Sequence, residues 1–323
     1  MMSTHICYLC FSRNTTFVGR NSDFSSDIFI CNNCGLIQNN FVSQGYLDDY
    51  YHSKYRATRK EGISPGYLKF MGDRGRSQYD FIIKNLPAST TLSSVLDIGA
   101  SAGKLLEQFH PASKLFAVES DSSMIEHLIN TGFIEVINGD VLFDNENIEK
   151  FDLVTLSHVF EHINNPLNYL YKLYKIVAPG GYVFLEVPNE PLHLMRHYLL
   201  KKQKGIGHLF DYTVDTLNQM IHKSGLFTIE KIVTFSIDVN DYIKGASIRN
   251  FEENQSGNGI HIRCLLKKND KANIRHEHEY IDSILQNHYR NQIAQEEWIE
   301  KSLSELKSLR KTLDKIKILV KVK

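Results

Sequence analysis

Four of the five cysteines fall in the first 34 residues, where they form two C-x-x-C pairs separated by twenty residues. Two thiolates at this spacing can reach the same metal ion, and four thiolates leave no coordination position open for chemistry. The pattern therefore predicts a structural zinc site formed by Cys7, Cys10, Cys31 and Cys34. A redox dithiol is the alternative, but it requires only one such pair. The fifth cysteine, Cys264, lies in an apolar run and is predicted to be a small buried side chain.

A second group of residues that could do chemistry begins at Asp97, in the segment DIGASAG (97–103). This segment follows an apolar run and precedes a helix that we expect to begin near Lys104. Small residues allow the backbone to turn sharply and to approach a ligand closely. The spacing D-x-G-x-x-x-G differs from the dinucleotide fingerprint G-x-G-x-x-G. An acid before the first glycine suits a ligand that has a cationic or zwitterionic end and no pyrophosphate.

Two further carboxylates follow at the ends of the next apolar runs. Glu119 closes the second run, where a carboxylate can accept both hydroxyls of a ribose. Asp140 closes the third run, where a carboxylate can accept a hydrogen from an adenine amino group. Each acid alone is most simply a solvated loop residue, but three acids at successive strand ends are hard to obtain by chance.

A histidine-rich segment follows the fourth apolar run. Its pattern His158-x-x-Glu161-His162 matches a zinc motif of metalloproteases. We reject that interpretation, because the motif lies just past a strand end in a nucleotide-binding core and has no obvious third ligand. An imidazole, with a pKa near 6.5, can instead serve as a general base. Structural histidines that cap a short helix are an equally good interpretation.

The elements that must position these residues alternate between short apolar runs and helical patterns from about residue 76 to residue 268. This alternation predicts βαβ units and an α/β fold with a mostly parallel sheet. We expect residues 1–40 to form the zinc ribbon, 41–75 a tyrosine-rich connector, and 269–323 a helical extension. The predicted strands are 93–99, 114–120, 134–140, 151–157, 181–188, 226–237 and 259–268.

The composition excludes several classes of protein. The 323 residues include 37 basic and 37 acidic side chains, so the chain lacks the basic excess that is typical of nucleic-acid binders. No run approaches the ~18–20 consecutive apolar residues that a membrane span needs. The first residues lack the basic and apolar regions of a signal peptide. We therefore expect a soluble, cytoplasmic protein.

These motifs together resemble those of class I S-adenosylmethionine-dependent methyltransferases, over roughly residues 76–268. DIGASAG resembles their nucleotide loop, AVES (117–120) their ribose-binding strand end, NGD (138–140) their adenine-side acid, and APGG (178–181) their Pro-Gly-Gly turn. The resemblance implies a three-layer Rossmann-like sheet with an antiparallel last strand, and methyltransferase activity. The cofactor residues that it implies are Asp97, Gly99, Ser101, Gly103, Glu119, Asp140 and His158.

The ribbon, followed by CGLIQNN and YLDDYYHSKYR, resembles a subset of these enzymes that act on sugars and sugar nucleotides. The resemblance implies O- or C-methylation in polysaccharide or glycoconjugate biosynthesis. It also suggests His162 or His208 as the catalytic base, with His158 shaping the pocket. Four basic residues could form a diphosphate-binding surface beside this site: Arg196, Lys201, Lys202 and Lys204.

Two other functions fit the same motifs less well. An RNA methyltransferase guided by the ribbon is disfavoured, because residues 1–50 contain two Arg and no Lys against four Asp. The chain also lacks an N/D-P-P-Y/F motif after the fourth run. A non-catalytic scaffold on the same fold is disfavoured by the complete set of Asp97, Glu119 and Asp140.

The C-terminal segment carries a narrow apolar seam on a basic background. Residues 301–323 contain eight Lys or Arg against two acids, and the seam consists of Leu306, Leu309, Leu313, Ile316 and Val320. This spacing predicts a helix that packs on the core or pairs with a second chain as a homodimer. Peripheral contact with an anionic membrane surface is the alternative.

Overall fold

The computed structural model describes residues 5–21, 23–24, 26–40, 42, 44–50, 63–144, 149–189, 207–238, 241–242, 244 and 251–272. All of them belong to one compact unit, Met1–Ile274, and a second unit comprises Arg275–Lys323. The predicted C-terminal helix, its seam and the basic residues 196–204 lie outside the described residues. The predictions that rest on these segments therefore remain predictions.

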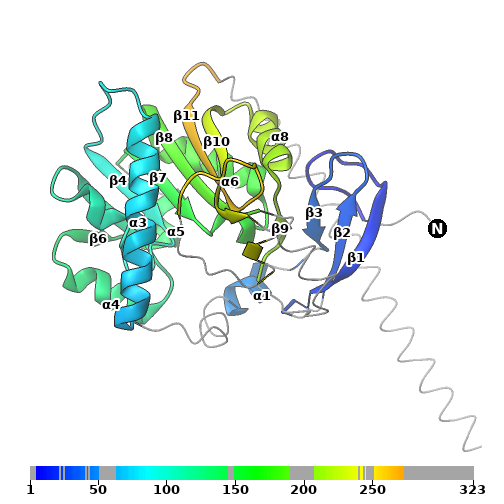
Figure 1. Ribbon diagram of the computed structural model, residues 1–323, viewed down its shortest axis with the longest axis horizontal. Coiled ribbons are helices and arrows are strands. Elements are labelled where there is room, and N and C mark those ends of the chain that lie inside the picture. The colour runs from blue at the N-terminus through cyan, green and yellow to red at the C-terminus, as the bar shows by residue number, and fades with distance from the viewer. Residues whose placement is uncertain are drawn as a thin grey trace, which may run out of the picture. The chain divides into compact units, whose positions relative to one another are not determined.

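A seven-stranded sheet forms the centre of the larger unit (Figure 1), in the order β10-β11-β8-β7-β4-β5-β6. β4 pairs in parallel with β5 and β7, and β11 is antiparallel to both of its neighbours. This arrangement confirms the predicted α/β fold with a mostly parallel sheet. The strands are β4 (Ser94–Ile98), β5 (Lys114–Val118), β6 (Ile134–Val136), β7 (Phe151–Ser157), β8 (Val177–Pro188), β10 (Phe227–Asp238) and β11 (Gly259–Lys268).

The helices of this unit begin where the sequence offers capping groups. α3 and α6 each have a proline in the first turn, where the missing N–H has no intrahelical partner to lose. The hydroxyl of Thr213 accepts a hydrogen bond from the backbone N–H of Thr216 and completes a capping box. The helices are α1 (Gln44–Asp49), α3 (Pro65–Asn85), α4 (Ser122–Asn130), α5 (Gly139–Asp144), α6 (Pro166–Ile176) and α8 (Val214–Ser224).

The N-terminal region forms a separate antiparallel sheet of four strands, in the order β1-β2-β3-β9. β1 (Thr15–Asn21), β2 (Ser26–Cys31) and β3 (Ile37–Asn39) come from the first 40 residues. β9 (Phe210–Asp211) comes from the segment that precedes α8, and it pairs with β3. A strand from the region that the sequence assigns to the methyltransferase domain therefore completes the sheet of the predicted ribbon.

Two local predictions are wrong. Instead of a helix beginning near Lys104, the chain forms turns and a 3₁₀ segment, η2 (Leu106–Phe109). Pro111 follows shortly after and has no backbone N–H with which to continue a helix. The third predicted strand ends at Val136 rather than at Asp140, because the chain enters α5 at Gly139.

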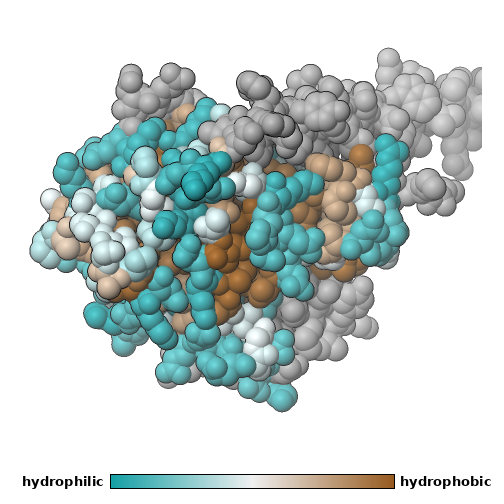
Figure 2. Space-filling model, turned by 90° about the horizontal axis from the view of Figure 1, so that it is seen from above, coloured by the Kyte–Doolittle hydropathy of each residue, from teal (hydrophilic) through white to brown (hydrophobic). Residues whose placement is uncertain are grey.

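The surface seen from above is mostly hydrophilic, with apolar side chains gathered near the centre of the view (Figure 2). Large apolar side chains that are exposed among the described residues include Phe17 and Ile129. Within the ranges described above, no helix combines the length and the apolar character needed to cross a bilayer.

Candidate active site

The glycine-containing segment after β4 turns back over the end of β5. Gly99, Ser101 and Gly103 have positive φ angles of 74°, 49° and 68°, a conformation that glycine adopts readily and serine does not. The backbone N–H groups of Gly99 and Ala100 donate to the carbonyl of Val118 at 2.8 and 3.2 Å. The segment that the sequence predicted as a ligand loop is therefore a tight turn at the carboxyl edge of the sheet.

The carboxylate of Glu119 stabilises this turn by accepting hydrogen bonds from backbone N–H groups. Its Oε2 accepts a hydrogen bond of 2.7 Å from the backbone N–H of Ser101. Its Oε1 accepts hydrogen bonds from the backbone N–H groups of Ser120 and Asp121, at 2.8 and 2.9 Å. The sequence predicted Glu119 as a ribose ligand but gave no sign that it also holds the loop. A carboxylate fixed in this way has little rotational freedom to lose when a ligand binds.

Asp97 is the second carboxyl group at this edge, and it is almost fully buried. The hydroxyl of Thr155 donates to its Oδ1 at 2.7 Å. Burial, together with the charge of Glu119, raises the pKa of Asp97 to about 7 although Thr155 opposes this shift. Because a nearby cation would favour the charged form, this position suits the cationic end of a ligand.

Asp140 lies in α5, at its second residue, rather than at the end of β6. The short helix follows β6 closely, since the backbone N–H of Ile137 still donates to Ala117 of β5 at 2.8 Å. The side chain of Asp140 lies outside the described atoms, so its contact with adenine remains a prediction.

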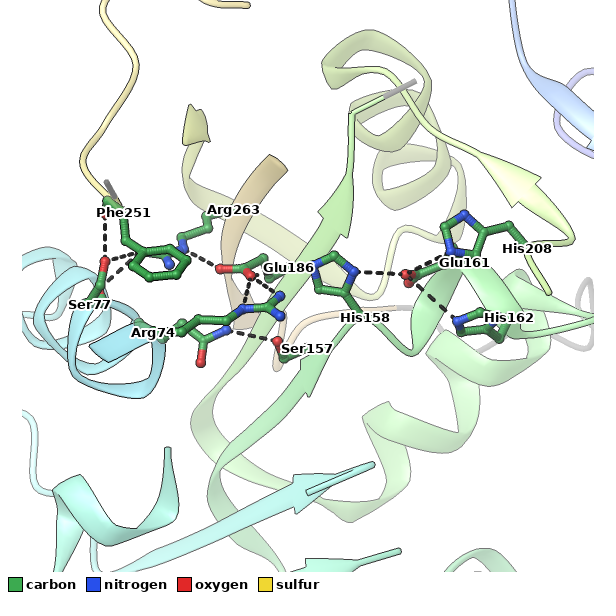
Figure 3. Close-up of polar contacts among 11 residues, drawn as sticks. Arg74, Ser77, Ser157, His158, Glu161, His162, Glu186, His208, Phe251 and Arg263 are labelled. Carbon is green, nitrogen blue, oxygen red and sulfur yellow. Dashed lines mark hydrogen bonds and ion pairs between the residues drawn. The ribbon is translucent and has the colours of Figure 1, made fainter. Parts of the chain in front are cut away.

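The three predicted histidines surround the carboxylate of Glu161 (Figure 3). Nδ1 of His158 lies 3.4 Å from Oε1 of Glu161. Nε2 of His162 lies 3.9 Å from the same oxygen, and Nε2 of His208 lies 3.8 Å from it. Glu161 and His162 belong to a 3₁₀ turn, η3 (Phe160–His162), whereas His208 precedes β9. The structure therefore brings together residues from two distant segments that the sequence analysis named as candidate bases.

The electrostatics of this histidine cluster (His158, Glu161, His162 and His208) are set by the buried carboxylate. Glu161 is 1% exposed. Burial would raise the pKa of Glu161, but the ring of His158 and the charges of His162 and His208 lower it to about 2. The carboxylate is therefore ionised at neutral pH.

His162 and His158 are each fixed in a particular orientation. Nδ1 of His162 lies 2.7 Å from the carbonyl oxygen of Gly207, to which it donates its hydrogen. Nε2 of the same ring is then the nitrogen that carries the lone pair. His158 has a φ of 56°, which is uncommon for a residue other than glycine, and its backbone N–H donates to the carbonyl of Glu186 at 2.7 Å.

A buried ion-pair network lies beside the histidine cluster, and the sequence analysis missed it. The carboxylate of Glu186 in β8 accepts hydrogen bonds from Arg74 of α3 and from Arg263 of β11. Nε2 of His158 lies 3.5 Å from Glu186 as well. The two guanidinium groups hold the pKa of Glu186 well below its usual range despite burial. The sequence does contain a signal for this pair, because Glu186 and Arg263 are each a charged residue inside an otherwise apolar strand. The structure places them directly opposite each other across β8 and β11.

The N-terminal sheet anchors the segment that carries His208. The side-chain amide of Asn39 donates to the carbonyl of His208 at 2.7 Å, and that of Asn21 donates to the same oxygen at 3.4 Å. The carboxylate of Asp23 accepts from the backbone N–H of Gly207 at 3.0 Å. On the other side, the backbone N–H of Leu209 donates to the carbonyl of Glu161 at 2.9 Å. His208 is therefore held between the N-terminal sheet and the η3 turn.

The four N-terminal cysteines converge on one point and form a cysteine cluster (Cys7, Cys10, Cys31 and Cys34). Sγ of Cys7 lies 3.5 Å from that of Cys34, and Sγ of Cys10 lies 3.4 Å from that of Cys31. All four sulfur atoms lie within 4.8 Å of one another. Thiolates that bind one zinc ion at about 2.3 Å in a tetrahedron are separated by roughly 3.8 Å, so the cluster fits this ion. As predicted, Cys264 is a fully buried member of β11.

Comparisons with known proteins agree with this picture. The chain is 26% identical, over 147 residues, to the mitochondrial ubiquinone biosynthesis O-methyltransferase of Dictyostelium discoideum. The matched region covers 40% of this chain and 46% of that protein, so the chain spans about half the length of this relative.

Two solved structures have a similar fold. NodS, an N-methyltransferase from Bradyrhizobium japonicum in complex with S-adenosyl-L-homocysteine, is 16% identical with a TM-score of 0.47, covering 67% of this chain and 98% of NodS. A chain from the complex between the Haloferax volcanii Trm112 methyltransferase activator and its methyltransferase partner is 15% identical with a TM-score of 0.48. The match covers 66% of this chain and 97% of that chain.

The family comparison matches the region that contains the loop, the strand ends and the histidine cluster. The description of this family is "Methyltransferase domain", and the match extends over residues 67–231, just over half of the chain. The chain therefore belongs to the methyltransferase domain family, and the enzyme class predicted from the sequence is confirmed.

Proposed function

We propose that the protein transfers a methyl group from S-adenosylmethionine to a sugar or sugar nucleotide. The observation that carries this proposal is the adjacency of two sites. Asp97 and the glycine-containing loop are at the end of β4, and the histidine cluster follows β7, which pairs directly with β4. In open α/β sheets, ligands bind at the carboxyl ends of such neighbouring strands.

The donor side fits the proposed cofactor. When bound, S-adenosylmethionine supplies an electrophilic methyl group on a sulfonium. The buried carboxyl group of Asp97 offers a partner for the cationic amino end, and Glu119 offers a fixed carboxylate for the ribose hydroxyls. Both roles agree with the resemblance found in the sequence.

The acceptor side is the histidine cluster. Methyl transfer is an in-line displacement, so the protein chiefly aligns the reactants and removes a proton from the acceptor. Nε2 of His162 carries the lone pair when Nδ1–H is donated to Gly207, and His208 lies close by, with its ring centroid 4.8 Å from that of His162. One of these two imidazoles would take the acceptor proton as the methyl group passes from the sulfonium to the acceptor; the sulfur–methyl bond breaks and a neutral thioether is the leaving group.

The sugar class of acceptor is supported by the ribbon and connector motifs. The Dictyostelium relative is named as an O-methyltransferase, which supports oxygen as the acceptor atom. The cysteine cluster supports the same site indirectly: one bound zinc ion stabilises the N-terminal sheet, and β3 of that sheet pairs with β9 beside His208.

The test is incubation with isotopically labelled S-adenosylmethionine and a panel of nucleotide sugars, followed by mass spectrometry. We expect one labelled methyl group on a sugar. The double variant His162→Ala/His208→Ala should lose roughly 10²–10⁴-fold in turnover while cofactor affinity measured by calorimetry stays nearly unchanged. Glu126→Gln, at an exposed position on α4, is the matched control. Absence of cofactor binding would overturn the proposal, and normal turnover in the double variant would exclude a histidine base.

A further inference from the structure

The carboxylate of Glu161 is buried among histidine rings but is not hydrogen-bonded to them. Glu161 is 1% exposed, and neither of its carboxylate oxygens has a hydrogen-bond partner among the described residues. The surrounding ring nitrogens lie 3.4 to 3.9 Å from Oε1, which is too long for good hydrogen bonds. Because a buried carboxyl group without a direct hydrogen-bond partner is costly, the geometry indicates that a group between these atoms completes the site.

We propose that Glu161, His162 and His208 bind one divalent transition-metal ion. The sequence offers Glu161 and His162 as neighbours but no third ligand, and the fold supplies His208 from the segment before β9. The three ligand atoms all lie within 4.8 Å of one another. Oxygen and nitrogen ligands about 2.0–2.2 Å from a tetrahedral ion are separated by roughly 3.3–3.6 Å. The separations of Glu161 from the two imidazoles, 3.9 and 3.8 Å, exceed this range by only a few tenths of an ångström. The two imidazole nitrogens lie within 4.8 Å of each other, so binding an ion requires them to move closer together by up to about 1 Å.

The second contact of each imidazole supports this proposal. Metal-binding histidines usually donate their other ring N–H to a carbonyl or carboxylate, which fixes the ring and the tautomer. Nδ1 of His162 donates to the carbonyl of Gly207 at 2.7 Å. Nδ1 of His208 lies 3.7 Å from Oδ1 of Asp211, so a small rotation forms the corresponding contact. In both rings Nε2 is then directed toward Glu161.

A neighbouring set of three residues makes an instructive contrast. His158, Glu186 and His261 also place one ligand atom each within 4.8 Å of the others. Glu186, however, already accepts hydrogen bonds from Arg74 and Arg263. Two guanidinium groups satisfy its oxygens and repel a cation, so this set does not bind a metal ion. The ion-pair partners of Glu161 among the described residues are histidines and include no arginine, so no guanidinium group repels a cation at this carboxylate.

The ligand types indicate which ions fit. Two imidazoles and one carboxylate suit Zn²⁺, Mn²⁺, Fe²⁺ or Co²⁺, whereas Mg²⁺ prefers oxygen ligands. Three protein ligands leave a coordination position open. If the proposed function holds, an acceptor hydroxyl occupies that position, where the ion lowers its pKa, and the imidazole of His158 takes the proton. Metal binding engages Nε2 of His162 and of His208, so in the metal-loaded protein His158 replaces them as the base assigned under the proposed function.

The test uses Co²⁺ added to metal-free protein, because the cysteine cluster and the histidine site give different spectra. Cobalt bound by four thiolates has sulfur-to-metal charge-transfer absorption, whereas cobalt bound by nitrogen and oxygen does not. We expect two equivalents of Co²⁺ per chain in the wild type, and one equivalent, with thiolate character, in Glu161→Gln and in His208→Ala. Glu126→Gln should bind two. Circular dichroism checks that each variant is folded.

Two results separate this proposal from the proposed function. If both variants are folded and bind Co²⁺ with the stoichiometry and spectrum of the wild type, the metal site is overturned. If the site binds Co²⁺ but no sugar is methylated, the metal site stands and the proposed function fails. Full turnover of protein that holds metal only at the cysteine cluster would overturn the role of the ion in activating the acceptor.

Discussion

The side-chain amide of Asn39 donates a hydrogen bond of 2.7 Å to the main-chain carbonyl of His208, which lies 169 residues further along the chain. Next to this bond, Gln38 of β3 pairs with Phe210 of β9. The N-terminal sheet therefore contributes directly to the position of a histidine at the proposed acceptor site. We infer that this sheet is part of the catalytic scaffold rather than an independent appendage.

Replacing Asn39 by Ala should lower turnover by tenfold or more, because the His208 segment loses its anchor. Cofactor affinity should change less than about twofold, since Asp97 and Glu119 are untouched. The variant loses the side-chain hydrogen bonds of Asn39 to His208, Leu209 and Ser26, which should lower the free energy of unfolding by about 1–3 kcal/mol. Steady-state kinetics and calorimetry make the comparison, with Asn130→Ala at an exposed position as the control. Wild-type turnover in Asn39→Ala would show that the anchor has no role.

Metal analysis should find one zinc ion at the cysteine cluster, with four sulfur ligands. Replacing Cys31 by Ser should release this ion, loosen the N-terminal sheet and lower turnover, while cofactor binding survives. Cys264→Ala serves as the control, because Cys264 lies in β11, outside the cluster. Hydrogen exchange of β1 to β3 reports the order of the sheet. An ordered sheet in protein that contains no zinc would contradict the prediction.

The stability of the ligand-free protein should fall as the pH rises from about 4 to about 7, through the contribution of Asp97. Burial raises the pKa of this carboxyl group from 3.8 to about 7, so in this range the unfolded state ionises first. The stabilising contribution is complete below the unfolded pKa and is lost as the pH passes the folded pKa. Asp97→Asn should remove this dependence in thermal denaturation, whereas an unchanged profile would exclude Asp97 as its source.

Glu119→Ala should weaken S-adenosylmethionine binding by tenfold or more. The carboxylate fastens the loop through Ser101 and is the proposed ribose ligand, and each charge-assisted hydrogen bond contributes about 1.5–3 kcal/mol. Glu119→Gln keeps the shape but reduces the acceptor capacity, so its effect should be intermediate. Calorimetry measures both. An unchanged dissociation constant in folded Glu119→Ala would remove Glu119 from the site.

The positions of Asp97 and Glu119 could be predicted because they depend on a simple rule: parallel strands end at the same edge of a sheet. The convergence of His162 and His208 was anticipated only through resemblance, since it depends on β9 pairing with β3. The network of Glu186, Arg74 and Arg263 depends on the register of β8 and β11, which a single sequence does not specify. The chain forms turns after Gly103 instead of the expected helix, because Pro111 has no backbone N–H with which a helix could continue.

The pairing of β3 with β9 also has a consequence for how the chain folds during synthesis. With Asn39 and His208 separated by 169 residues, the ribosome needs roughly 10 to 30 s to deliver the partner strand. During that time β3 is an unpaired sheet edge, and such edges invite pairing with other chains. β3 is only three residues long, which limits that hazard. The acceptor side of the site therefore assembles long after the loop at β4 has been synthesised.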